Sequence, residues 1–220
     1  MHQAAEKDRT EELKILIESG MDVDTPDSEK NTPLHIAAHY GNYDSVKLLI
    51  EHGADVSAVN EYEMTPLHEL LETKKEQNVR VAELLVKHGT PVNAKSSSGT
   101  TPVHRTVIKN DKASLNFLIS AGADVNIPAY DGMTPFLSAS FFGLTDVCKI
   151  LLDHGADPYA ADNAGDNALH QTAVLDKDET AVFLVQHGVN SSAKNKKGET
   201  PLDIAVKNES SRIIKILKSN

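Results

Sequence analysis

The chain has few aromatic residues and almost no cysteine, and both shortages limit what it can be. Of its 220 residues, 40% are apolar, but only 5% are aromatic and Trp is absent. This composition predicts a core of small and branched aliphatic side chains in thin layers rather than one deep centre. The single cysteine, Cys148, excludes an internal disulfide framework and fits a reducing compartment. We therefore expect a cytoplasmic protein, with the nucleus or delivery into a host cell's cytosol left open.

Long apolar runs and an excess of basic charge are also missing. No run of about 18 apolar residues occurs, and residues 1–14 lack the apolar stretch of a secretory signal, so neither a membrane span nor a leader is expected. The net charge of −10 opposes tight binding to nucleic acid. Residues 194–220 carry seven Lys or Arg and three Asp or Glu, hence +4, which leaves −14 for residues 1–193. We interpret the short basic stretch as solvated, with a nucleic-acid patch as the minor alternative.

Motifs that carry catalysis or hold a cofactor do not occur. The chain has no GxGxxG, Walker or GxSxG motif, and HELLE at 68–72 has Glu72 where the HExxH of zinc proteases has its second His. Cys148 lies in a helical aliphatic pattern, which favours a buried small hydrophobe over a nucleophile. We predict neither an enzyme nor a bound cofactor or metal.

What the chain does have is a repeat. A Thr (once Asn) recurs in steps of 33, 36, 33, 33 and 33 residues, and a Gly recurs in the same steps. The first set is Thr32, Thr65, Thr101, Thr134, Asn167 and Thr200, and the second is Gly20, Gly53, Gly89, Gly122, Gly155 and Gly188. Two markers in phase over the whole chain indicate a stacked array of repeats.

Each repeat can be interpreted physically. Thr is a good N-cap, and Pro directly after it has the φ angle that the first helical residue needs. Small residues such as Ala37 and Ala38 follow where a neighbouring helix comes close, and then a turn and a second, aliphatic helix. The second helix ends at the recurring Gly, which can adopt the left-handed conformation. A connector rich in turn formers leads to the next Thr and is expected to form a hairpin.

These phrases resemble the ankyrin repeat family, with TPLHIAA at residues 32–38 and GADVN at 122–126. The resemblance covers essentially the whole chain and implies an all-α ankyrin repeat α-solenoid of about seven helix pairs with short β-hairpin fingers. We expect a single domain over 1–220, divided into repeats 1–26 (partial), 27–59, 60–95, 96–128, 129–161, 162–194 and 195–220 (C-terminal cap). In the family, binding usually uses the fingers and the first helix of each pair.

Eight of the ten histidines occupy two recurring positions, which argues against a metal site. Four stand three residues after the capping residue and four just before the recurring Gly: His35, His68, His104 and His170, then His52, His88, His154 and His187. The resemblance implies that the first four satisfy polar groups between repeats. Adjacent helices pack about 8–10 Å apart, too far for equivalent histidines to bind one ion at about 2 Å.

If shared residues build the scaffold, function must lie in the positions that vary. Half of the ten Phe and Tyr residues fall in the finger and groove positions, with Met and Ile beside them and acidic residues around them. Such side chains are enriched at protein interfaces. The candidate partner-binding residues are Tyr40, Tyr62, Met64, Ile108, Tyr130, Asp131, Met133, Phe141 and Phe142. The alternative is that Phe141 and Phe142 fill the space between two repeats, beside Val174 and Leu175.

Two further departures from the repeat pattern leave alternatives open. Glu69 and Arg105 stand where other repeats have an aliphatic residue, and we expect them either to pair across neighbouring repeats or to join the binding surface. The three extra residues of the longer repeat lie within Lys74–Gln77. They predict a solvated loop, with a docking element as the second interpretation.

We therefore predict a monomeric, non-enzymatic scaffold that binds another protein or peptide. Its site is expected at repeats three to five and should take an apolar segment flanked by basic residues, not nucleic acid or membrane. The alternatives are the recruiting or regulatory part of a larger enzyme or effector, and a small-ligand-binding groove.

Overall fold

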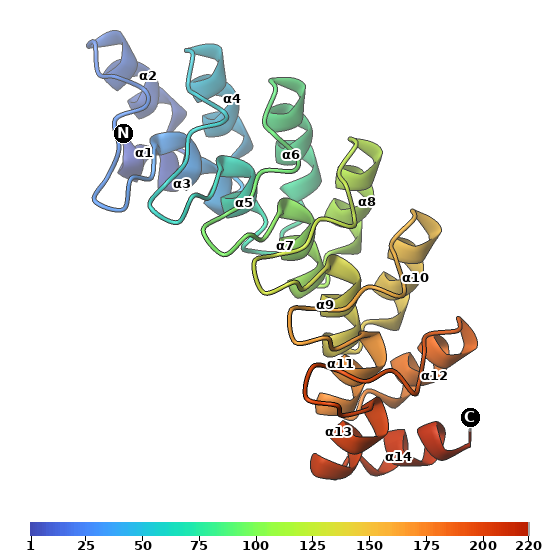
Figure 1. Ribbon diagram of the computed structural model, residues 1–220. Helices are drawn as coiled ribbons and strands as arrows, with labels where there is room; N and C mark the ends of the chain where they lie inside the picture. The colour runs from blue at the N-terminus through green and yellow to red at the C-terminus, as the bar shows by residue number, and fades with distance from the viewer. Residues whose placement is uncertain (220) are drawn as a thin grey trace. The chain divides into compact units, whose positions relative to one another are not determined.

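A computed structural model describes residues 1–219 and shows an all-α repeat architecture (Figure 1). Fourteen helices form seven pairs in the described residues, which confirms the predicted fold class. They are α1 His2–Glu6, α2 Thr10–Glu18, α3 Pro33–Tyr40, α4 Tyr43–Glu51, α5 Pro66–Leu70, α6 Asn78–Lys87, α7 Pro102–Ile108, α8 Lys112–Ser120, α9 Pro135–Phe142, α10 Thr145–Asp153, α11 Ala168–Val174, α12 Asp178–Gln186, α13 Pro201–Lys207 and α14 Ser211–Lys218.

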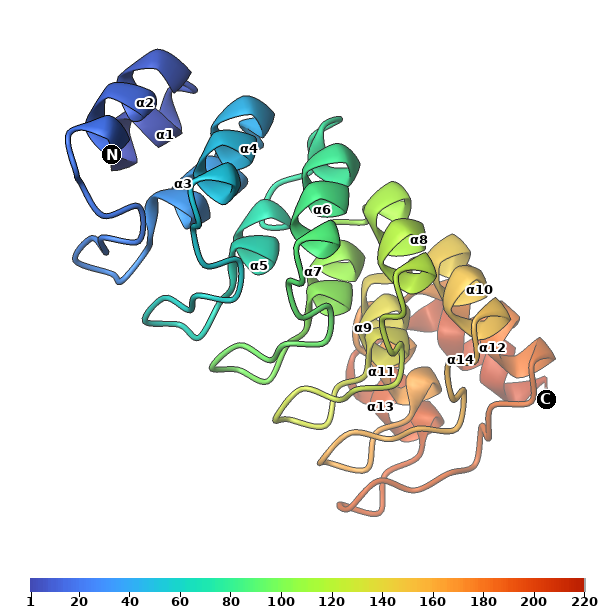
Figure 2. The same ribbon diagram turned by 90° about the horizontal axis from the view of Figure 1, so that it is seen from above.

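The chain divides into two compact segments, Met1–Ala123 and a second that begins at Asp124. In the N-terminal segment the odd-numbered helices α1, α3, α5 and α7 pack in one row, and α2, α4, α6 and α8 pack in another. In the C-terminal segment α9, α11 and α13 form the first row and α10, α12 and α14 the second. We call the odd-numbered helices inner and the even-numbered helices outer. Within each segment the connecting loops project to one side of the inner row (Figure 2).

The inner helices begin at the recurring Thr because its side chain satisfies a free helical N–H. Thr32 Oγ1 accepts a hydrogen bond from the backbone N–H of His35, and His35 Nδ1 accepts one from the backbone N–H of Thr32 at 3.1 Å. Pro33 fills the first helical position. The helix ends at Gly41, whose φ of 70° is left-handed and favours glycine. The same local sequence thus sets both ends of α3.

The core consists of thin aliphatic layers between stacked pairs. Ala37 and Ala38 are fully buried, since a small side chain lets the neighbouring inner helix approach. Phe136 is the one aromatic side chain among the largest fully buried ones, and the others are all leucines. Burying such aliphatic side chains stabilises the fold by roughly 1.5–3 kcal/mol each.

The fingers are turns rather than β-hairpins. Two short-range backbone hydrogen bonds close each of these turns: Asn60 N–H to Met64 O at 3.1 Å and Glu63 N–H to Asn60 O at 3.0 Å in one finger, and Asp162 N–H to Asp166 O at 3.1 Å and Gly165 N–H to Asp162 O at 2.9 Å in another. Residues 1–219 contain no strand, only the isolated bridge between Ala161 and Asn167. The predicted strands are absent because the residues between the connector and the helix all belong to the turn. No extended residues remain there to form paired strands. Neighbouring fingers are joined by isolated hydrogen bonds, such as Asn163 N–H to Asp131 O at 2.9 Å and Asn163 Nδ2–H to Tyr130 O at 2.8 Å.

Candidate functional site

The histidines that follow the caps hold adjacent repeats together. His35 Nε2 lies 2.9 Å from Met64 O, His68 Nε2 lies 3.3 Å from Thr100 O, and His170 Nε2 lies 3.1 Å from Glu199 O. Burial lowers the pKa of His35, and it lowers the pKa of His68 to about 4. The rings of His35 and His68 are therefore neutral structural groups at physiological pH.

The other recurring histidines lie at the ends of outer helices. His52 Nδ1 lies 2.8 Å from Leu48 O, and His154 and His187 make the equivalent contacts at 2.9 and 2.7 Å. Each therefore satisfies a carbonyl in the last turn of its own helix. Among residues 1–219, no three His, Cys, Asp or Glu side chains lie close enough to hold a metal ion.

Cys148 is buried on α10. Its Sγ lies 3.8 Å from Ser140 Oγ, and burial raises the pKa of the thiol to about 12. A thiol with this pKa remains protonated at neutral pH and makes a poor nucleophile. The side chain acts as a small core residue.

The C-terminal segment leaves apolar side chains open on adjacent inner helices. Phe142 at the end of α9 is 41% exposed, and Val174 and Leu175 at the end of α11 are 41% and 45% exposed. Tyr130, in the finger before α9, is 62% exposed. We call these four residues the C-terminal apolar surface. Phe142, Val174 and Leu175 are therefore not buried in the space between two repeats.

The other predicted residues of this segment border that surface. Phe141 is half-buried, and its ring meets that of Phe142 edge to face at a centroid distance of 5.2 Å. Asp131 is exposed, and its Oδ1 accepts a hydrogen bond from the Met133 N–H at 2.9 Å. Met133 is half-buried. The predicted residues from Tyr130 to Phe142 thus lie on one finger and the helix that follows it.

Acidic side chains outnumber basic ones in the part of the chain that carries the C-terminal apolar surface. Residues 124–193 contain ten Asp or Glu and two Lys, a net charge of 2 − 10 = −8. In the finger before α11, Asp162 accepts a hydrogen bond from Gln171 Nε2 at 2.8 Å, and Asp166 accepts one from Asn195 Nδ2 at 2.8 Å. Polar contacts hold these carboxylates in place beside the inner row, without a Lys or Arg partner in either bond.

The predicted residues of the N-terminal segment are more scattered. Tyr40, Tyr62 and Ile108 are 44%, 50% and 41% exposed, each on a different repeat. Met64 is only 7% exposed, so its side chain offers almost no surface to a partner. Its backbone oxygen accepts from His35, and its sulfur lies 3.9 Å from Arg105 Nη2. Met64 thus belongs to the packing between repeats.

Two polar side-chain pairs, one of them an ion pair, cross the inner row of the N-terminal segment diagonally. The seventh residue after the cap in one repeat meets the fourth residue after the cap in the next. His39 Nδ1 lies 3.0 Å from Glu69 Oε2, and Glu72 Oε1 lies 2.6 Å from Arg105 Nη1. We call these two pairs the charged ladder. Of the two alternatives for Glu69 and Arg105, the pairing with each other is wrong, because the offset between stacked helices brings non-equivalent positions together.

The sequence interpretation did not select several residues that belong to the C-terminal apolar surface or lie in or beside the charged ladder. Val174, Leu175, His39, Glu72 and Lys109 were not among the predicted binding residues, although all lie seven or eight positions after a cap. Those positions contain Tyr40, Ile108, Phe141 and Phe142 as well. Comparison of all side chains at these positions, rather than of aromatic ones first, would have found them.

The longer repeat forms a loop that is fastened to its neighbours. Lys74 Nζ donates to Asn110 O at 2.8 Å, and Lys75 Nζ donates to His39 O at 2.9 Å. Both carbonyls lie at the C-terminal ends of inner helices, where a cation is favoured. The loop thus connects its own repeat to those on both sides.

Comparisons with known proteins agree with this architecture. The sequence profile described as "Ankyrin repeats (3 copies)" matches residues 1–96, 67–162 and 136–220. The human ASB11 ankyrin repeat domain superposes with a TM-score of 0.84 at 24% identity and covers 98% of this chain and 96% of that one. The ankyrin repeat domain of Bcl-3 gives 0.81 at 26% identity, with 99% and 96% covered.

The curated relatives are much longer proteins. Neurogenic locus notch homolog protein 1 of Danio rerio is 35% identical over 79 residues, which is 36% of this chain and 3% of that protein. Rabankyrin-5 of Mus musculus is 30% identical over 115 residues, 46% of this chain and 10% of that protein. Protein phosphatase 1 regulatory subunit 12A of Mus musculus is 41% identical over 64 residues, 29% and 6% respectively. Within residues 1–219 no helix has the length and apolar character needed to cross a bilayer.

Proposed function

Because the chain belongs to the ankyrin repeat family, we propose that it is a non-enzymatic module that binds another protein on its C-terminal apolar surface. Ankyrin repeat domains are generally protein-interaction modules. The observation that carries the proposal is the exposure of Phe142, Val174 and Leu175 on two adjacent inner helices. Apolar side chains on a solvent-exposed face are typical of protein interfaces.

The charge of this part of the chain favours a basic partner. The net charge of −8 over residues 124–193 favours a basic segment, because opposite charge speeds encounter and excludes acidic competitors. Asp131, Asp162 and Asp166 lie in the fingers beside the apolar side chains. The bound segment therefore presents one or two apolar side chains flanked by Lys or Arg. We place Tyr130, Asp131, Met133, Phe141 and Phe142 in this site together with Val174 and Leu175.

The test is peptide selection against the full chain. A library of random peptides displayed on phage should yield sequences with an apolar residue between basic ones, and their binding should weaken at high salt. Val174→Asp should reduce binding of a selected peptide by about tenfold or more, which corresponds to about 1.4 kcal/mol.

A matched variant controls for the substitution itself. Val182 on outer helix α12 is 40% exposed, against 41% for Val174. Val182→Asp introduces the same charge at the same exposure and should leave binding within about twofold. Equal losses in the two variants, or acidic character in the peptides whose binding depends on Val174, would contradict the proposal.

The size of the relatives favours a second proposal for the whole protein. Each matched region makes up 3–10% of a longer protein in the three relatives named above. The chain then acts as the recruiting portion of a larger polypeptide, and the same surface binds what that polypeptide acts on. Immunoblotting of source-cell lysate with an antibody against this chain should then detect a polypeptide much larger than 23.9 kDa. A single band at that mass would contradict it.

A further inference from the structure

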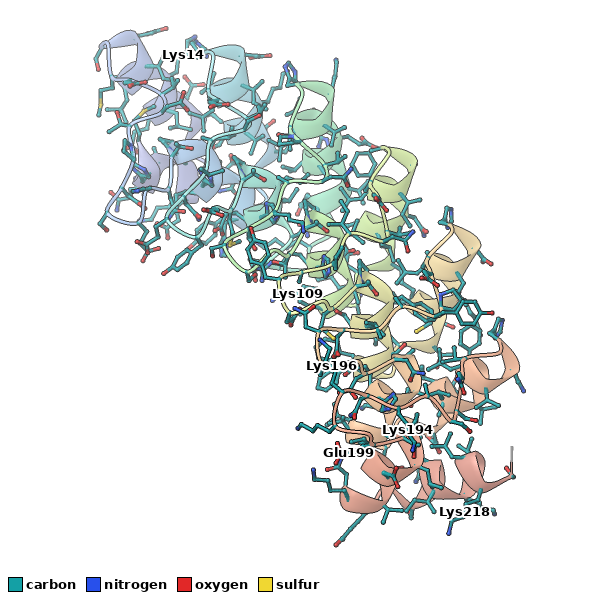
Figure 3. All side chains as sticks on the ribbon, viewed as in Figure 1. Lys14, Lys109, Lys194, Lys196, Glu199 and Lys218 are labelled. Atoms are coloured by element: carbon teal, nitrogen blue, oxygen red, sulfur yellow. The ribbon has the colours of Figure 1, made fainter. Side chains whose placement is uncertain are left out.

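Two cations share one carboxylate on the inner row of the N-terminal segment. Glu72 Oε1 lies 2.6 Å from Arg105 Nη1, and Glu72 Oε2 lies 3.3 Å from Lys109 Nζ. The three side chains are 23%, 20% and 33% exposed, so solvent reaches all of them. The cluster carries +1 within a chain of net charge −10. Lys109 lies at the inner row in Figure 3, whereas Lys14 projects from an outer helix.

The guanidinium of Arg105 is incompletely used. A carboxylate can bind Arg through two parallel N–H donors, but Glu72 divides its oxygens between Arg105 and Lys109. Arg105 Nε is buried without a hydrogen-bond acceptor among the described residues. Its Nη2 has a sulfur contact at 3.9 Å to Met64, and a thioether is a weak acceptor. The cations of this cluster therefore have donor capacity that Glu72 does not satisfy.

The neighbouring groups make the surroundings of Arg105 and Lys109 more positive, which favours a bound anion. Lys74 Nζ is held 2.8 Å from Asn110 O, directly after Lys109 in the chain, which brings a third cation to the same helix end. The nearest acidic side chain on the ladder, Glu69, is already bonded to His39 Nδ1 at 3.0 Å and to Asn60 Nδ2 at 2.9 Å. Glu72 is thus the one carboxylate that pairs with Arg105 and Lys109 in the described residues, although Glu76 and Asp111 lie beside Lys74.

We propose that Arg105 and Lys109 receive a carboxylate side chain of a bound protein, and that the exposed Ile108 between them in the helix contacts an apolar neighbour of that side chain. Glu72 is then the resident carboxylate that occupies the site when no partner is bound. The occupant is an acidic–apolar segment, opposite in charge to the one expected at the C-terminal apolar surface. The two proposals concern different segments of the chain, so either can fail without the other.

The test uses two short probes, N-acetyl-Glu-Leu-amide and N-acetyl-Gln-Leu-amide, titrated into the isotope-labelled full chain and followed by NMR. The Glu probe should shift the Arg105 Nε–H and Ile108 methyl signals with a dissociation constant of about 1–10 mM, and the Gln probe should not. Glu72→Gln should tighten binding of the Glu probe by about five- to tenfold, because it removes the competing charge but keeps an acceptor oxygen.

A matched control is available on outer helix α4. Glu51 lies 3.8 Å from Lys47 in an exposed ion pair, so Glu51→Gln removes the same charge without creating the site and should leave binding unchanged. Lys109→Met, which keeps the Glu72–Arg105 pair, should weaken binding severalfold and reports on the site even if Glu72→Gln misfolds. Equal response to both probes, no response to either in any variant, or no gain in Glu72→Gln would overturn the proposal.

Discussion

The inner rows of the two segments use the same positions for different chemistry. In the N-terminal segment, positions four and seven after the cap hold the charged ladder, His39 with Glu69 and Glu72 with Arg105. In the C-terminal segment the corresponding residues are Phe141 with Gln171 and Val174 with Ile204. The N-terminal inner row pairs polar side chains at these positions, whereas the C-terminal row leaves Phe142, Val174 and Leu175 exposed. These positions do not determine the fold, and so they can differ between repeats and define what each segment binds.

The histidines three residues after the caps also differ between the segments, and the stability of each segment at low pH should show this difference. In the N-terminal segment, α3, α5 and α7 follow a Thr cap and all have His at this position. In the C-terminal segment, α9 has Leu137 and α13 has Asp203 there. Since the pKa of His68 falls from 6.5 to about 4, the folded state binds fewer protons than the unfolded state. Its stabilisation is present above pH 6.5 and is lost as the pH falls towards 4, by roughly 3 kcal/mol.

Hydrogen exchange at pH 7 and pH 4.5 should therefore show the N-terminal segment losing protection first. His68→Leu, which copies the residue of α9, should cost about 2 kcal/mol at pH 7 through the lost bonds to Thr65 and Thr100. It should also reduce the dependence on pH. A C-terminal segment that opens first in acid would refute this explanation.

The charged ladder should behave as a coupled pair. Glu72→Leu leaves Arg105 half-buried without its acceptor, which should cost about 2 kcal/mol, whereas Glu72→Leu with Arg105→Leu should cost less than the sum of the single changes. The double variant also converts this part of the ladder to the apolar character of the C-terminal row. Urea unfolding of the four proteins in the cycle measures the coupling, and strictly additive losses would show that the pair has none.

The finger before α7 lacks a side-chain acceptor that other fingers have. Asp162 Oδ1 accepts from the N–H groups of Ala164 and Asp166 at 2.8 and 2.9 Å. The side chain of Ser96, at the same position of its repeat, instead bonds to the hydroxyls of Ser98 and Thr100. Ser96→Asn should supply that acceptor and stabilise the N-terminal segment by about 0.5–1 kcal/mol. Thermal unfolding checks the gain, and Asp162→Ser should produce the opposite change in the C-terminal segment.

The smallest expected effect comes from the connectors. Asn126 Oδ1 accepts from Asp157 N–H at 2.8 Å and its Nδ2 donates to Gly155 O at 2.9 Å, but Asp24 at the equivalent place can only accept, from Asp55 N–H. Burial raises the pKa of Asp24 above its ordinary value of 3.8. The folded state therefore loses stability as the pH rises from 3.8 through the higher pKa of the folded state.

Asp24→Asn should therefore stabilise the protein by about 0.5 kcal/mol at pH 7 and by less at pH 3, where Asp24 is protonated. Paired melting curves at the two pH values measure the difference. A gain that is larger at pH 3 would show that ionised Asp24 stabilises the fold, which is the opposite of the expected sign.

Local patterns in the sequence were sufficient for the fold and its repeats. Thr at the cap, Pro at the first helical position and the small residues that follow act within one or two helical turns, so their effects can be read without a structure. The same holds for His35 and its equivalents, whose role came from the family resemblance and whose bonds the structure supplies.

The prediction of the binding surface was less complete, for a physical reason that particular residues show. Met64 is an apolar residue in a finger position, but the direction of its side chain depends on the next repeat, which buries it. Glu69 and Arg105 share a position in the repeat, yet their partners are His39 and Glu72. Val174 and Leu175 lack an aromatic ring, so only their exposure identified them.

The sequence by itself determined the period, the helix ends, the aliphatic core and the family of this protein, because each depends on residues close together in the chain. The tertiary structure alone decided which side chains meet across stacked helices and which stay open to solvent. Those outcomes depend on the offset between neighbouring repeats, which no single repeat encodes. The diagonal pairing of Glu72 with Arg105 and the open face formed by Phe142, Val174 and Leu175 are both consequences of that stacking.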